Sequence, residues 1–241
     1  MPPFTWTDPA VLAFVVIPIL LIALLLMCVS TASRAVGEPD SVRRRAMATT
    51  AISAALWMGV TWAAAATGIL RRWDATPPPF GLLVVGIVLV AVALSRGHYG
   101  WRFAAGLPLW MLVAIQGFRL PLEVAMHAMY ERGIMPVQMS YSGRNFDILT
   151  GISAVLLAWA LASGRGGRRL VLLWNVAGLL LLLNVVIVAI LSTPRFRYFG
   201  DEHLNVWVTY PPFVWLPSVM VVAALAGHVL IFRAIRIARS G

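Results

Sequence analysis

The stretch AVLAFVVIPILLIALLLMCVS, Ala10–Ser30, decides the fold class. It contains no charged side chain, and a run of roughly 20 apolar residues is what a helix needs to cross the hydrocarbon core of a bilayer. Six further apolar runs follow along the chain, at residues 47–70, 80–94, 106–130, 148–162, 170–191 and 211–235. The pattern predicts an all-α, polytopic transmembrane helix bundle of seven spans.

The composition agrees with this fold class. Of the 241 residues, 61% are hydrophobic and 12% are charged, whereas soluble domains average roughly half and a quarter. The apolar runs leave no stretch for a separate soluble domain, so residues 1–241 are expected to form one transmembrane domain. A net charge of +10 would suggest nucleic acid as the partner of a soluble protein. Here the arginines lie between the apolar runs, so we expect the lipid bilayer as partner, no nucleic acid, and leave a homo-oligomer open.

The arginines also predict an orientation, because loops on the cytoplasmic side of a membrane protein carry an excess of basic residues. With the N-terminus outside, twelve arginines fall on the cytoplasmic side and six on the outer side. The cytoplasmic set is Arg34, Arg43, Arg44, Arg45, Arg96, Arg102, Arg165, Arg168, Arg169, Arg233, Arg236 and Arg239, and the outer set is Arg71, Arg72, Arg132, Arg144, Arg195 and Arg197. This twofold bias predicts an outside N-terminus and a cytoplasmic C-terminus.

The fourth apolar run differs from the others because it carries polar and charged residues at helical spacing. Gln116, Arg119, Glu123, His127 and Tyr130 fall within an arc of roughly 80° on a helix. Arg119 with Glu123, and Glu123 with His127, are i,i+4 pairs that can come into contact. A charge inside the membrane costs roughly 3 kcal/mol on insertion scales, so we expect these residues to pair and to face the bundle interior.

Further polar residues are expected on the outer side near this stripe. Arg144 and Asp147 precede the fifth apolar run, and Asn184 lies in the outer half of the sixth. Together with the stripe they predict an outward-facing pocket that binds or transports a small polar or anionic solute. Arg119 would supply a fixed positive charge, and Glu123 and His127 would form a protonatable pair.

Two other functions stay open. In the first, the chain is an intramembrane enzyme that uses Glu123 and His127 as acid and base; no nucleophile stands at a suitable spacing, so no catalytic residue is assigned. In the second, the chain is a redox or assembly subunit of a membrane complex, and Arg119 and Glu123 only neutralise each other. The stripe itself does not separate these hypotheses.

Cofactor classes are narrowed by what the chain contains. The chain has 19 arginines and no lysine. A retinal Schiff base needs a lysine, so a retinal protein is excluded. His127 and His203 lie on the outer side, and His98 and His228 on the inner side. Two pairs at two depths are typical of a dihaem cytochrome. However, His98 falls in a short polar loop and His228 near a span end, where it can bond a backbone carbonyl, so haem is not expected.

A divalent metal ion is the other alternative. Glu123 and His127 with His203 would supply the oxygen and nitrogen ligands that such an ion accepts. The identity of any cofactor stays open.

The segment Gly143–Gly151, GRNFDILTG, follows the Arg119-x-x-x-Glu123 pair and precedes Pro212–Pro217, PFVWLP. With these motifs the second half of the chain resembles a group of bacterial multi-span membrane proteins that have no assigned activity. The resemblance implies a bacterial integral membrane protein, located in the cytoplasmic membrane, and implies nothing about mechanism.

Overall fold

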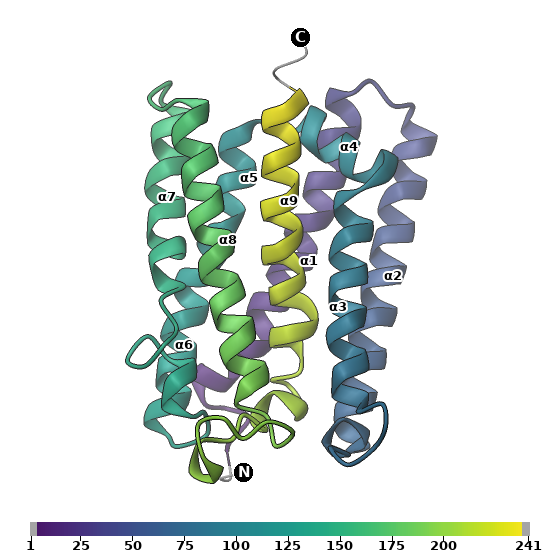
Figure 1. Ribbon diagram of the computed structural model, residues 1–241. Coiled ribbons are helices and arrows are strands. Elements are labelled where there is room, and N and C mark those ends of the chain that lie inside the picture. The colour runs from purple at the N-terminus through teal and green to yellow at the C-terminus, as the bar shows by residue number, and fades with distance from the viewer. Residues whose placement is uncertain (1–3, 238–241) are drawn as a thin grey trace.

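The computed structural model describes residues 4–237, which fold into an all-α bundle (Figure 1). Most helices run along one common direction, and α1 begins at the end of the bundle opposite to the one where α9 ends. Of the arginines considered above, Arg239 lies outside the described residues.

Several helices are long and apolar enough to cross a membrane. By length and composition there are five such segments in residues 4–237: α1 (Pro9–Ala35), α2 (Asp40–Ala66), the α5–α6 segment (Leu109–Glu131), α8 (Arg168–Leu191) and Leu216–Ile237. A sixth results if α3 (Pro79–Ser95) and α4 (Gly97–Gly106), which meet at a bend of 58°, form one span. The chain therefore has the character of a multi-pass membrane protein. The apolar α7 (Ile148–Ala162) has only 15 residues, so helix length does not by itself give seven spans.

The second span starts earlier and ends earlier than its hydrophobicity predicted. It begins at Asp40 rather than at residue 47, because the three arginines after Pro39 continue the helix instead of forming a loop. It ends at Ala66 rather than at residue 70. Gly68 adopts a φ of +80° just beyond, a conformation that glycine takes without steric cost and that commonly follows a helix end.

The fourth span is helical throughout but irregular in the middle. α5 (Leu109–Ile115) begins after Pro108, later than the predicted residue 106, and leads through a 3₁₀ turn, η2 (Gln116–Phe118), into α6 (Arg119–Glu131). The 3₁₀ turn lies one turn before Pro121, which has no N–H to donate to the Gly117 carbonyl. The polar stripe therefore begins where the helix changes its winding.

The last span begins at Leu216 rather than at residue 211. Pro211 and Pro212 have no amide hydrogen, so the segment up to Trp215 forms turns. A π-helical turn, η6 (Leu216–Val221), then leads into α9 (Val222–Ile237). This last helix is the most buried of the five long segments, and it supplies one wall of each cavity described below.

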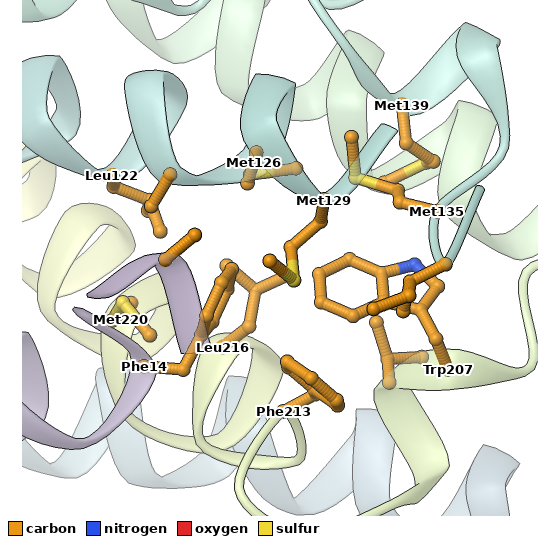
Figure 2. Packing of buried hydrophobic residues seen from close by; sticks show 14 of the residues in the cluster. Phe14, Leu122, Met126, Met129, Met135, Met139, Trp207, Phe213, Leu216 and Met220 are labelled. Carbon is orange, nitrogen blue, oxygen red and sulfur yellow. The ribbon is translucent and has the colours of Figure 1, made fainter. Parts of the chain in front are cut away.

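The loops at the end where α1 begins are folded against the helices. They contain the 3₁₀ turns η1 (Ile69–Arg71), η3 (Val137–Met139), η4 (Asp201–His203) and η5 (Trp207–Thr209). Trp207 is fully buried, with its ring centroid 5.4 Å from that of Phe14 and 5.1 Å from that of Phe213. Figure 2 shows these rings among methionines from α6, η3 and η6, so the loops at this end of the bundle are part of the core.

Candidate functional site

A cluster of polar side chains lies buried between α6, α7, α8 and α9. None of its members is more than 5% exposed, and the helices around them are strongly apolar, so these polar groups are shielded from water. The members are Arg119 and Glu123 of α6, Asn145 and Asp147 just before α7, Asn175 of α8 and His228 of α9. Buried polar groups are costly unless they bond one another, and these form one connected network.

Arg119 is the centre of the network. Its Nη1 donates to Oδ1 of Asp147 over 2.9 Å, and its Nη2 lies 3.1 Å from Nε2 of His228. A guanidinium can only donate hydrogen bonds, so this His228 nitrogen must be the acceptor. Nδ1 of His228 then carries the hydrogen and donates to Oδ1 of Asn175 over 2.8 Å. The neighbours thus select one neutral tautomer of His228, which bonds side chains rather than the backbone carbonyl expected from the sequence.

Glu123 is held by Asn145 and not by Arg119. The Asn145 amide donates to Oε2 of Glu123 over 2.8 Å and to the Met139 carbonyl over 3.0 Å. Its Oδ1 accepts the backbone N–H of Asp147 at 3.0 Å. The predicted Arg119–Glu123 ion pair is therefore wrong, because Asp147, from the segment facing α6, takes the guanidinium instead. An i,i+4 spacing permits contact but does not impose it.

Two glycines allow the helices to come close enough for these short side chains to meet. A Cβ on Gly151 of α7 would lie 2.5 Å from the backbone nitrogen of Leu120 and 3.0 Å from the carbonyl carbon of Arg119. A Cβ on Gly178 of α8 would lie 2.9 Å from Cε1 of His228. Without a side chain at these positions, α7 packs directly on the α6 backbone, and His228 fits against α8.

A cavity of about 150 Å³ adjoins the network. Arg119, Glu123 and Asp147 contribute to one wall, and apolar side chains of α3, α8 and η6 line most of the rest. Among its lining residues, Val88 of α3 and Leu183 of α8 are more than 40% exposed, so the cavity reaches the surface between these two helices.

Two polar residues on this wall of the cavity each lack one kind of partner within the described residues, a hydrogen-bond acceptor in one case and an ionic partner in the other. Nε of Arg119 is buried and has no hydrogen-bond partner. The wall also holds two carboxyl groups but only one guanidinium, and the guanidinium is already paired with Asp147. It can therefore offer a solute one free N–H donor and one carboxyl, that of Glu123, without an ionic partner.

His127 and Tyr130 lie outside this cavity. Nδ1 of His127 is 2.8 Å from Oγ of Ser140, its ring stacks on Tyr141 at 4.2 Å, and the nearest carboxylate is that of Glu131 at 3.6 Å. The predicted Glu123–His127 pair is therefore wrong. From Gln116 to Tyr130 the stripe rises by roughly 21 Å, at 1.5 Å per residue, so its two ends meet different neighbours.

The remaining predicted site residues, Gln116, Arg144 and Asn184, do not line the cavity either. Gln116 is buried and donates from Nε2 to the Ala224 carbonyl at 3.3 Å, while its Oε1 has no partner. Asn184 donates to the backbone carbonyl of Arg144 at 2.7 Å, and the Arg144 guanidinium lies over the Phe199 ring, 5.3 Å from its centroid. Arg144 and Asn184 join each other at the edge of the bundle and do not line the cavity.

The three residues considered for a divalent ion are not brought together. Within residues 4–237 no group of three or more His, Cys, Asp or Glu side chains is placed to hold a metal ion. His203 takes part through its backbone carbonyl, which accepts a hydrogen bond from Gln138. His98 is bonded to Glu38 at the opposite end of the bundle.

Asn145, Asn175 and His228 were not predicted as members of the site. Asn175 had a usable signal, since an amide inside an otherwise apolar helix needs a partner. His228 was considered only for haem, and nothing along the sequence connects it to Arg119. No protein-family model matches the chain, and the comparisons with curated proteins and with solved structures gave no match either.

Proposed function

We propose that the chain crosses the cytoplasmic membrane of a bacterium seven times, with its N-terminus outside and its C-terminus in the cytoplasm. The start of α1 and the end of α9 lie at opposite ends of the bundle, which supports an odd number of crossings. α7, the fifth apolar segment along the chain, would bring the number of spans to seven; its 15 residues are extended by the buried Asn145–Asp147 segment. The twofold arginine bias between the two ends supports the orientation.

We further propose that the cavity beside Arg119 binds a small polar solute and that the protein transports it or senses it. The observation that carries this proposal is that Arg119 lines the cavity while its buried Nε lacks an acceptor. A buried donor without a partner is costly, and a bound acceptor would satisfy it. The cavity of about 150 Å³ is smaller than the roughly 300–1,000 Å³ of pockets for drug-sized ligands, so the solute is small.

The charges favour an uncharged or cationic solute over an anionic one. Asp147 already neutralises Arg119 at 2.9 Å, so the arginine is no longer a free positive charge for an anion. Glu123 is bonded only to a neutral amide and can accept an N–H group of the solute or exchange a proton with it. The anionic part of the sequence-based expectation therefore loses its support, and the polar part is kept.

The enzyme alternative has less support, because His127 and Glu123 have separate partners. The hypothesis of an assembly subunit would explain the buried Arg119–Asp147 pair as purely structural. It does not explain why a buried donor of the same guanidinium is left without an acceptor.

The experiment is a thermal-shift screen of the purified protein with small amides, amines and amino acids, and with formate and acetate as anionic contrasts. A ligand that binds only the folded state raises the unfolding temperature by mass action. We expect stabilisation by a member of the first group that is lost in Glu123→Gln and retained in His127→Asn, the control outside the cavity. The proposal would be contradicted if no compound stabilised the protein between pH 5 and 8, or if only the anions did.

A further inference from the structure

A second and larger cavity lies between α1, α2, α3 and α9, away from the polar site. Its volume is about 460 Å³, within the range of roughly 300–1,000 Å³ typical of ligand pockets. Its lining is almost entirely apolar and includes Leu21 and Leu25 of α1, Val90 of α3 and Leu230 of α9. Such a space, left empty, would deprive its walls of dispersion contacts.

The few polar groups in this lining leave little for water to bond. The Thr50 hydroxyl is 2.7 Å from both the Ala46 carbonyl and the Tyr99 hydroxyl, and the Ser218 hydroxyl donates to the Val214 carbonyl at 2.8 Å. A buried water needs two to four polar partners, which these satisfied groups do not offer. The occupant must therefore be apolar where it lies in the cavity.

The cavity is open towards the side of the bundle. Ser53, Leu56 and Val60, which line it from α2, are exposed, and Val90 and Leu94 line it from α3. Trp57 of α2 packs on Gly86 of α3, where a Cβ added to the glycine would lie 3.1 Å from the Trp57 ring. The two antiparallel helices meet at this contact. In a chain that spans the membrane, this opening faces the acyl chains of the bilayer.

Two exposed arginines lie beyond one end of the cavity: Arg45 comes five residues before Thr50 of α2 and Arg96 two residues after Leu94 of α3, and both of these residues line the cavity. Arg45, in the first turns of α2, lies on the same helical stripe as Ile52 and Leu56, since seven and eleven residues complete whole turns. Arg96 directly follows α3, and the beginning of α2 and the end of α3 lie at the same end of the bundle (Figure 1). Within residues 4–237, neither arginine forms an ion pair.

We propose that this cavity binds a phospholipid with an anionic headgroup. One acyl chain fills the apolar space between α1, α2, α3 and α9, and the phosphate lies between Arg45 and Arg96. Arginine is suited to a phosphate because its guanidinium donates hydrogen bonds in a planar fork. The lipid site shares no residue with the wall formed by Arg119, Glu123 and Asp147, so the two proposed sites can be tested independently.

The test is native mass spectrometry of the full chain in detergent, titrated with phosphatidylglycerol and with phosphatidylcholine of identical acyl chains. We expect phosphatidylglycerol to bind at least tenfold more tightly. Arg45→Gln with Arg96→Gln should weaken phosphatidylglycerol by roughly thirtyfold, at about 1 kcal/mol for each basic residue near a membrane surface, and weaken phosphatidylcholine less, because its choline group offsets the phosphate charge. The matched control is Arg72→Gln with Arg195→Gln, which removes two exposed arginines at the opposite end.

The apolar part is tested with two neighbouring alanines of α2. Ala54 lines the cavity and Ala55 is exposed outside it, so Ala54→Phe should lower the affinity for phosphatidylglycerol at least tenfold and Ala55→Phe should not. If Ala54→Phe does not fold, Val90→Phe fills the same space from α3. Equal binding of the two lipids, equal effects of the two phenylalanines, or a non-phospholipid apolar molecule retained in the purified protein would each overturn the proposal.

Discussion

A guanidinium among transmembrane helices is tolerated only when acceptors surround it. Arg119 has Asp147 and His228 on its two terminal nitrogens, and each of these is fixed by an asparagine. Asn145 and Asn175 therefore act through their neighbours: the first holds the Glu123 carboxyl and the backbone N–H of Asp147, and the second sets the His228 tautomer. The position of the arginine is determined by four side chains from three other segments.

Removing either member of the buried ion pair should be more damaging than removing both. Arg119→Leu and Asp147→Leu each leave an uncompensated buried charge, which typically costs roughly 3–5 kcal/mol. In the double variant both members of the pair are removed together, so we expect its loss of stability to be well below the sum of the two single losses. The measurement is thermal unfolding of the three variants in detergent, and simple additivity would show that the residues are not coupled.

Glu123→Gln is expected to be mild in comparison. The Asn145 amide, which donates to Oε2 of Glu123 at 2.8 Å, can donate equally to the carbonyl of a glutamine. We expect a change in unfolding free energy of about 1 kcal/mol, the size of a typical hydrogen bond. A loss as large as that of Asp147→Leu would instead identify Glu123 as the counter-charge of Arg119.

At the scale of elements, the helices are positioned by close contacts at glycines. Gly151→Ala forces a methyl group against the α6 backbone, which cannot move aside as a side chain can. We expect a destabilisation of roughly 1–3 kcal/mol, as for other overpacked sites, together with loss of solute binding. Gly59→Ala on α2 is the control, because its Cβ would meet nothing within 4 Å, and its unfolding temperature should not fall.

The turn between α1 and α2 is tied to α4 by Glu38. Arg102 donates from Nη2 to Oε1 of Glu38 at 2.9 Å, and Nε2 of His98 lies 3.0 Å from the same oxygen. Burial by itself would raise the pKa of Glu38, but hydrogen bonds from Arg102, Ser33 and His98 outweigh it, and the pKa lies below its ordinary value of 4.5. The ionised carboxyl is therefore favoured by the fold.

This lowered pKa predicts a particular acid sensitivity. Because the pKa of Glu38 is lower in the folded than in the unfolded state, its contribution to stability is complete above about pH 4.5. It is lost as the pH falls through the folded value. In Glu38→Gln the unfolding temperature should fall less steeply with pH below about 4.5, and thermal scans between pH 3 and 7 would check this. An unchanged acid limb would contradict the assignment.

The sequence predicts some of these elements well and others poorly, for a physical reason. α7 has the predicted bounds 148–162, because Asp147 and Ser163 interrupt the apolar run at its two ends. α2 differs because helix formation does not stop where hydrophobicity does, and Asp40–Arg45 continue the helix beyond the apolar residues. Hydrophobicity reports depth in the membrane, whereas prolines and glycines determine where the helices begin and end.

The same limit applies to the site across the whole molecule. Arg119 and Glu123 could be predicted because a charge in an apolar run is conspicuous by itself. Asp147 is also expected near the site, but its pairing with Arg119 and the contact with His228 could not be predicted, because these residues come from other segments and packing decides which faces meet. The sequence predicts that the stripe on this helix acts as one unit, but the bundle divides it between the cavity beside Arg119 and the His127–Tyr141 contact.

The number and direction of the crossings can be measured with single cysteines in a Cys28→Ala background. Ser142→Cys lies before α7 and Gly167→Cys after it, and nothing within 4 Å surrounds an added Cβ at Gly167. An impermeant thiol reagent applied to intact cells should label the first and not the second. Labelling of both would mean that α7 does not cross, and the reverse pattern would invert the orientation.

The spacing of the Arg119 contacts along the chain has a consequence for how the protein is made. Asp147 follows Arg119 by 28 residues, whereas His228 follows by 109. During synthesis the charge can therefore be neutralised within one helical hairpin, soon after it enters the membrane. The cavity is complete only when the last segment arrives, so a truncated chain that stops before α9 would insert its arginine safely yet lack the solute site.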